Sequence, residues 1–192
     1  MKSVFSKSKE IKKEADELLS QFKLVELLSQ YGSVHITGSY DLDLMFKKDI
    51  DISLVNNNIS VAEFSELGKE LIDRLNTPSV YYRNTRITPV DKRPENSLYW
   101  GIRTGDWFID IWAMNSEVYR RADSYIRKIK SQLTEERRLI ILSLKEDMLK
   151  SNRYSREFGS RELYDAVLNY NVKDLSELNN YLSKLASNNI YL

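Results

Sequence analysis

The spacing of apolar positions along the chain changes from helical to strand-like and then back to helical. Between residues 7 and 31, apolar side chains recur every three to four positions, which predicts a helix. Two short β-rich runs follow, "SVHITGS" and "DIDISLV", and an apolar i, i+3, i+4 set between them predicts a helical turn. Residues 60–76 return to the helical period, with Ser60 as the predicted N-cap.

The second half of the chain shows the same change of period. The runs "SVYYRNTRITPV", "SLYWGIRTG" and "DWFIDIWAM" are rich in β-branched and aromatic residues, and the last two predict an antiparallel hairpin. From Ser116 onward the period is helical in four segments, at 116–133, 134–151, 160–170 and 174–187. The pattern predicts an α+β fold, with a mixed β-sheet core in residues 1–115, helices on one face, and a C-terminal helical bundle in residues 116–192.

Composition removes several kinds of chemistry from consideration. The 192 residues are 42% hydrophobic and 30% charged, which is ordinary for a folded chain. The absence of cysteine excludes disulfides, zinc ribbons and thiol nucleophiles, and the single histidine, His35, leaves little room for a Ser-His-Asp triad. Any metal site must therefore be built mainly from oxygen. The Lys- and Ser-rich start, Met1 to Lys13, resembles neither a signal sequence nor a membrane span, so we expect a cytoplasmic protein.

Charge is unevenly distributed along the chain. The net charge of +1 argues against a protein dedicated to gripping long nucleic acid through its phosphates. From Arg120 to Arg161 there are 12 Lys/Arg against 6 Asp/Glu, a surplus of +6, while the rest sums to −5. This layout suits a polyphosphate held between a basic arm and an acidic part. Within the arm, Lys128 and Lys145 lie nearest the apolar stripes and are predicted to reach a triphosphate; the alternative is that both are ordinary solvated residues.

Two Asp-x-Asp pairs frame the region between the first two predicted strands. In a strand, alternate side chains share a face, so Asp49 and Asp51 point together while the intervening isoleucines form core. Taken alone, such a pair is most often part of a solvated sheet face. Asp41 and Asp43 are predicted instead to cap a short helix. We therefore interpret Asp41 and Asp43 as structural and Asp49 and Asp51 as the site.

A third carboxylate lies within an otherwise apolar strand. Asp110 is flanked by Ile109 and Ile111, and an ionised Asp there is costly unless it is paired or bound to a metal. One possibility is a salt bridge to Arg103 across the hairpin; the other is a strand that brings Asp110 beside the Asp49/Asp51 pair. Three carboxylate ligands without His or Cys favour Mg²⁺ or Mn²⁺.

A Gly-Ser step completes the pattern, because Gly38 lets backbone approach a phosphate and Ser39 offers a hydroxyl at a helix start. "GS", nine residues from Tyr40 to Lys48, "DID" and a distant "FIDI" strand resemble the DNA polymerase beta-like nucleotidyltransferase superfamily, most closely its small antibiotic-modifying and minimal bacterial enzymes. The resemblance covers roughly residues 30–115. Because a Tyr follows the Gly-Ser step, it gives no guide to base or acceptor preference.

This resemblance implies an α/β nucleotidyltransferase core with two magnesium ions and a nucleoside triphosphate, for example ATP. Asp49 and Asp51 would hold the triphosphate metal, and Asp51 with Asp110 the second metal. The triphosphate would sit on Gly38 and Ser39. Asp110 is also the first candidate to accept the acceptor's proton.

We therefore expect a magnesium-dependent nucleotidyltransferase that moves a nucleoside monophosphate to a hydroxyl of a small molecule, for example an antibiotic, and releases pyrophosphate. One alternative keeps the chemistry but changes the acceptor to a tRNA or a partner protein, as in toxin–antitoxin systems. Another is a non-catalytic nucleotide-binding module. The near-zero net charge disfavours nucleic acid as a partner, and we expect a monomer or homodimer without membrane association.

Overall fold

A computed structural model describes residues 3–90, 93–151 and 159–187. The chain divides into two compact units, one of residues 10–126 and the other of residues 1–9 with 127–192. Within the described ranges, no helix is both long enough and apolar enough to cross a membrane. The division at residue 115 that the sequence suggested stays a prediction.

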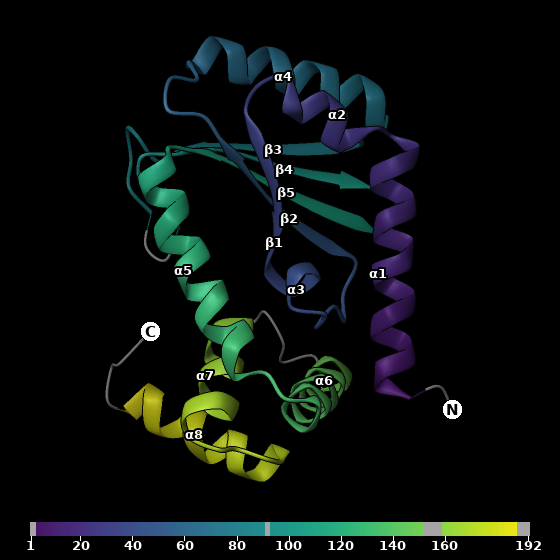
Figure 1. The fold of residues 1–192 in the computed structure, drawn as a ribbon, viewed down its shortest axis with the longest axis vertical. Coiled ribbons are helices and arrows are strands. Elements are labelled where there is room, and N and C mark those ends of the chain that lie inside the picture. Colours follow the sequence, from purple (N-terminus) through teal and green to yellow (C-terminus); the bar gives the residue numbers. More distant parts are fainter. Residues whose placement is uncertain (1–2, 91–92, 152–158, 188–192) are drawn as a thin grey trace. The chain divides into compact units, whose positions relative to one another are not determined.

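The unit of residues 10–126 is built on a five-stranded sheet (Figure 1). Its strand order is β1-β2-β5-β4-β3, with β1 Ser33–Thr37, β2 Asp49–Val55, β5 Trp107–Met114, β4 Leu98–Thr104 and β3 Ser79–Asn84. Strands β2 and β5 pair in parallel, and the other three pairings are antiparallel. The mixed sheet and the β4–β5 hairpin confirm the predicted α+β core.

Helices cover one face of this sheet (Figure 1). They are α1 (Val4–Gln21, from residue 10 on), α2 (Leu24–Ser29) and α4 (Val61–Leu75). Their apolar side chains pack on the face that carries Ile50, Ile52, Ile109 and Ile111, all of which are buried. The opposite face holds the intervening residues of each strand, the three candidate carboxylates among them.

Local sequence explains where the helices begin and end. The single helix predicted for 7–31 is two helices, because Lys23 adopts a left-handed conformation with φ 46° between them. The Ser60 N-cap prediction is confirmed: its hydroxyl accepts a bond from the Glu63 amide at 3.1 Å, and the Glu63 carboxylate accepts one from the Ser60 amide at 2.8 Å. Asn76, with φ 44°, ends α4.

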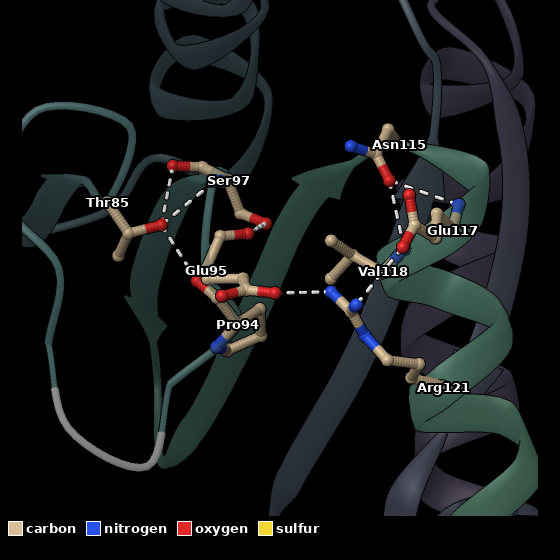
Figure 2. A network of polar contacts seen from close by, with 8 residues as sticks. All are labelled: Thr85, Pro94, Glu95, Ser97, Asn115, Glu117, Val118 and Arg121. Atoms are coloured by element: carbon tan, nitrogen blue, oxygen red, sulfur yellow. Dashed lines mark hydrogen bonds and ion pairs between the residues drawn. The ribbon is translucent and has the colours of Figure 1, made fainter.

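Hydrogen bonds and an ion pair hold the C-terminal end of the connection between β3 and β4 in place (Figure 2). The Thr85 hydroxyl donates to the Pro94 carbonyl at 2.7 Å and accepts from the Ser97 amide at 2.9 Å. The Glu95 carboxylate pairs with Arg121 of α5 (Ser116–Gln132). Residues 93–97 are therefore held between the sheet and the first turns of α5.

The four predicted C-terminal helices are confirmed, with ends that shift by at most one residue. After α5 come α6 (Glu135–Lys150), α7 (Ser160–Asn169) and α8 (Leu175–Ser187). Helix α5 begins in the sheet unit and ends in the helical unit, whose buried side chains include Ile141, Leu144, Met148, Leu163, Val167 and Leu178. Part of the predicted basic arm, residues 152–158, lies outside the described residues.

Candidate active site

The strand register places two of the three candidate carboxylates side by side. Asp51 of β2 is the register partner of Asp110 of β5, and Thr37 of β1 lies on the other side of Asp51. On the far side of Asp110, the row continues through Gly101 of β4 to Tyr81 of β3. Residues that are far apart in sequence thus form one line across the sheet face opposite to α1, α2 and α4.

Asp49 shares this face, because it lies two residues before Asp51 on the same strand. Its negative charge is close enough to raise the pKa of Asp110, whose pKa is raised first of all by burial. The three carboxylates therefore lie on one face, and the charge of Asp49 acts on Asp110. If Asp110 lay on the opposite face from Asp49, the two could not share a two-metal site. The strand register places Asp49 and Asp110 on the same face.

The side chain of Asp110 is held by a tyrosine that the sequence reasoning missed. The Tyr99 hydroxyl, from the neighbouring strand β4, donates a hydrogen bond to Asp110. Burial, and then this bond, raise the pKa of Tyr99, so the phenol keeps its proton and remains a donor. A Cβ on Gly101 would lie 2.2 Å from the Tyr99 hydroxyl oxygen, so only glycine leaves room for this contact.

A signal for Tyr99 was present in the sequence. Counting back from the turn at Gly105 puts Gly101 opposite Asp110, and Tyr99 is then the next residue on the same face. The predicted alternative partner, Arg103, lies opposite Phe108 instead. The cation whose charge lowers the pKa of Asp110 is Arg93.

Gly38 and Ser39 are the first two residues of α3 (Gly38–Asp41), directly after β1. Gly38 has φ +63°, a conformation that L side chains rarely adopt. A Cβ there would lie 2.2 Å from Oδ2 of Asp51. The backbone of the Gly-Ser step therefore packs directly against the carboxylate at the centre of the row.

The capping role predicted for Asp41 and Asp43 is wrong. Thr37 occupies the N-cap position of α3, Asp41 is the last residue of the helix, and Asp43 lies beyond it with φ 55°. The Asp43 carboxylate pairs with Lys12 of α1. Because α3 begins immediately after β1, Asp41 lies at its C-terminal end and Asp43 lies beyond it, so neither occupies the N-cap position.

The remaining candidates occupy different environments. The His35 ring stacks on Tyr119 of α5, with centroids 4.3 Å apart, which agrees with a packed sheet histidine. Lys145 is only 2% exposed in the helical unit, and its ammonium donates to the Tyr164 hydroxyl at 2.9 Å. Lys128 is an exposed residue of α5. A triphosphate-binding role for the two lysines stays a prediction.

The carboxylates of Asp49, Asp51 and Asp110 suit a hard divalent cation, but their oxygens do not converge on one point. Within the ranges that the structure describes, no group of three or more His, Cys, Asp or Glu side chains is arranged so that it could hold a metal ion. Strand register fixes the backbone positions of these residues but not the side-chain torsions that would bring their oxygens together around one ion. The chemistry of three carboxylates on one face, against the Gly38 backbone, fits Mg²⁺ or Mn²⁺.

Comparisons with known proteins identify the fold. No protein-family model matches the sequence, and no curated protein matches it. Several solved structures match with TM-scores above 0.5, and those cited here share about one residue in six with this chain.

A structure of the Cid1 poly(U) polymerase, as the H336N mutant bound to MgATP, has a TM-score of 0.61 at 16% identity and covers 85% of this chain and 51% of its own. The polymerase core of TRAMP, an RNA surveillance complex, has a TM-score of 0.58 at 15% identity, covering 96% and 65%. The non-canonical poly(A) polymerase complex GLD-2–GLD-3 has a TM-score of 0.55 at 16% identity, covering 88% and 59%.

The fold is therefore the nucleotidyltransferase fold. The sequence resemblance to the superfamily is supported at this level, while the small antibiotic-modifying subtype is not. This chain spans about half to two thirds of the length of the solved structures that it matches.

Proposed function

We propose that this protein is a metal-dependent nucleotidyltransferase. The observation that carries the proposal is the row in which Asp51 lies between Asp110 and Thr37, the last residue before Gly38, with Asp49 on the same face as Asp51. The alternative, a solvated sheet face, does not explain why burial raises the pKa of Asp110 or why Gly38 packs onto Asp51. Together these features concentrate negative charge at a point where backbone also approaches closely.

Each residue has a part in this proposal. Asp49, Asp51 and Asp110 would hold Mg²⁺ or Mn²⁺, and the Gly38-Ser39 step would carry the triphosphate. When bound, the metal would supply charge neutralisation for the triphosphate and the attacking oxygen. Asp110 would take the proton of the acceptor hydroxyl. The acceptor oxygen would bond to the α-phosphorus as pyrophosphate leaves.

The acceptor is the point at which the comparisons change our expectation. The solved structures that share this fold are named as enzymes of RNA ends, as poly(A) and poly(U) polymerases and a terminal U-transferase. This supports the alternative of an RNA hydroxyl as acceptor over the small molecule that the sequence suggested. We propose an RNA end as acceptor, and the small hydroxylated molecule becomes an outcome of the assay.

The test is incubation with MgCl₂ and each α-labelled nucleoside triphosphate, with a panel of acceptors. The panel holds an RNA oligonucleotide with a free 3′ hydroxyl, the same oligonucleotide with a dideoxy end, and small polyhydroxylated compounds. We expect pyrophosphate release and label on the free-ended RNA alone. Label on a small compound would move the acceptor back to the first expectation, and no label with any pair would refute the proposal.

Matched variants separate the site from the neighbouring acids. Asp51→Asn should abolish label transfer without lowering the thermal midpoint, because the change preserves size. The double change Asp41→Asn/Asp43→Asn should leave transfer largely intact, because Asp41 is the last residue of α3 and Asp43 lies beyond it, paired with Lys12 on the surface. If the double variant is the inactive one, the wrong pair has been assigned.

A further inference from the structure

We propose that the β3–β4 side of the carboxylate-bearing sheet face binds a single-stranded polynucleotide. The surface is defined by Tyr81 and Arg83 of β3, Arg103 of β4 and Phe108 of β5, and is called here the edge surface. The orientation of the bound strand rests on the proposed function, because the strand would bring its terminal hydroxyl to Asp110. The arguments for the surface itself come from register, exposure and charge.

Register places the four side chains on the same face as the carboxylates. Tyr81 is in line with Gly101 and Asp110, and Arg103 is in line with Phe108 and Asp49. The edge surface is thus continuous with the site across two strands. Two interstrand spacings amount to about 10 Å. A base stacked on Tyr81 would lie within a nucleotide or two of Asp110.

The aromatic residues of this surface are open to solvent or partly so. Tyr81 is 57% exposed, and its ring lies 6.5 Å from that of Phe108 at an angle of 49°. Phe108 is half-buried, and its ring closes over Gly101, where a Cβ would be 3.1 Å from its outer carbon. Exposed aromatic faces on a rigid sheet are the platforms on which unpaired bases stack without sequence preference.

The charge of the edge surface is opposite to that of the unit that bears it. Residues 10–126 carry 14 Lys/Arg against 19 Asp/Glu, a net charge of −5. Arg83 and Arg103 nevertheless both lie on this face beside the tyrosine. Arg93, at the C-terminal end of the β3–β4 connection, adds a third cation, whose charge acts on Asp110 and Tyr99. Aromatic rings interleaved with guanidinium groups fit the alternating bases and phosphates of a single strand.

The cations also reach toward the centre of the site. Arg83 of β3 is the register partner of Tyr99 of β4, whose hydroxyl donates to Asp110, and the charge of Arg93 also acts on Asp110. A phosphodiester bound by these arginines would therefore lie close to Asp110. This arrangement guides an anionic chain inward past carboxylates that would otherwise repel it.

Fluorescence anisotropy with an end-labelled RNA 12-mer and the full chain, in EDTA and without nucleotide, tests the surface apart from catalysis. A DNA strand of the same sequence forms a second arm, because stacking and phosphate contact alone do not distinguish the two. We expect Tyr81→Ala to weaken RNA binding about 10-fold and Tyr81→Phe to preserve it. Arg83→Ala should weaken binding and reduce the slope of log affinity against log salt by about 1.

The matched control is Tyr82→Ala. Tyr82 is the next residue of β3, is 42% exposed, and packs on Trp100 on the other face of the sheet, with ring centroids 5.0 Å apart. Its loss should leave RNA affinity unchanged. Equal weakening by Tyr81→Ala and Tyr82→Ala, an unchanged salt slope in Arg83→Ala, or no binding by the parent protein would each overturn the proposal. So would dissociation of a dimer by Tyr81→Ala without loss of RNA affinity, seen by light scattering.

The two proposals can fail separately. Strand binding that depends on Tyr81, in a protein that releases no pyrophosphate with any triphosphate, would support the edge surface and refute the transferase function. Transfer to a small compound without strand binding would support the transferase function and refute the edge surface. Asp51→Asn separates catalysis from strand binding, since it should lose transfer while its affinity for the 12-mer stays within about 2-fold of the parent.

Discussion

Replacing Gly38 with alanine should remove activity far out of proportion to stability. The new Cβ would lie 2.2 Å from Oδ2 of Asp51, whereas ordinary van der Waals contact begins at 3.4 Å. The carboxylate must therefore move by about 1 Å, and a displacement of that size at a reacting centre costs on the order of 100-fold in rate. Because a carboxylate can rotate, the overlap itself adds little to the free energy of folding.

Gly105→Ala supplies the matched control. Gly105 has φ +55°, close to the +63° of Gly38, but a Cβ there would meet nothing within 4 Å. Both variants carry the cost of a left-handed alanine, about 1–2 kcal/mol. For a chain of this size, that corresponds to a fall in thermal midpoint of roughly 2–8 °C, from about 2–4 °C per kcal/mol.

The assay combines thermal unfolding with pyrophosphate release. We expect similar falls in midpoint for both variants, and a loss of about 100-fold in kcat for Gly38→Ala alone. If the two variants keep equal activity, the Asp51 carboxylate does not take part in the reaction. If Gly38→Ala unfolds the protein while Gly105→Ala does not, the packing of Gly38 on Asp51 is structural.

Three further predictions concern other contacts. Tyr99→Phe should lower kcat about 10-fold with a smaller effect on triphosphate KM, and should weaken Mn²⁺ binding measured by electron paramagnetic resonance, because it removes the donor that orients the Asp110 carboxylate; an unchanged metal affinity would count against that role. Glu63→Gln should cost stability at pH 7 but not at low pH: the Ser60 amide and hydroxyl lower the pKa of Glu63, so its stabilisation is present above the ordinary value of about 4.3 and is lost as the pH falls through the lowered pKa, and a difference in urea midpoint that grows with acidity would contradict it. Lys128→Ala should raise the triphosphate KM more than the acceptor KM, and unchanged nucleotide affinity would make Lys128 an ordinary solvated residue.

Period and spacing alone predict the elements and the carboxylates of the site. Alternation in "DIDISLV" places Asp49 and Asp51 on one face because strand geometry has a fixed period of two. The hairpin and the four C-terminal helices follow from equally local signals. These features depend only on neighbouring residues, and so they can be read from one sequence.

The features that the sequence did not predict depend on torsions or on pairing between distant segments. The break at Lys23 and the early start of α3 are backbone choices within otherwise helical patterns. The bond from Tyr99 to Asp110 requires the exact register of β4 against β5 and an empty position at Gly101. The edge surface forms only because β3 pairs with β4 at the edge of the sheet. The sequence does not predict this position, since β3 follows a helix and could have paired with another strand.

The parallel pairing of β2 with β5 also sets the order in which the site can form. Asp51 and Asp110 are 59 residues apart, and β5 joins β2 only after β3 and β4 have been synthesised between them. Pairings that close long stretches of chain are entropically expensive and form slowly. Until β5 pairs with β2, only two of the three carboxylates, Asp49 and Asp51, are in place. Nucleotide binding would therefore report on completion of the sheet and distinguish the native fold from a collapsed intermediate.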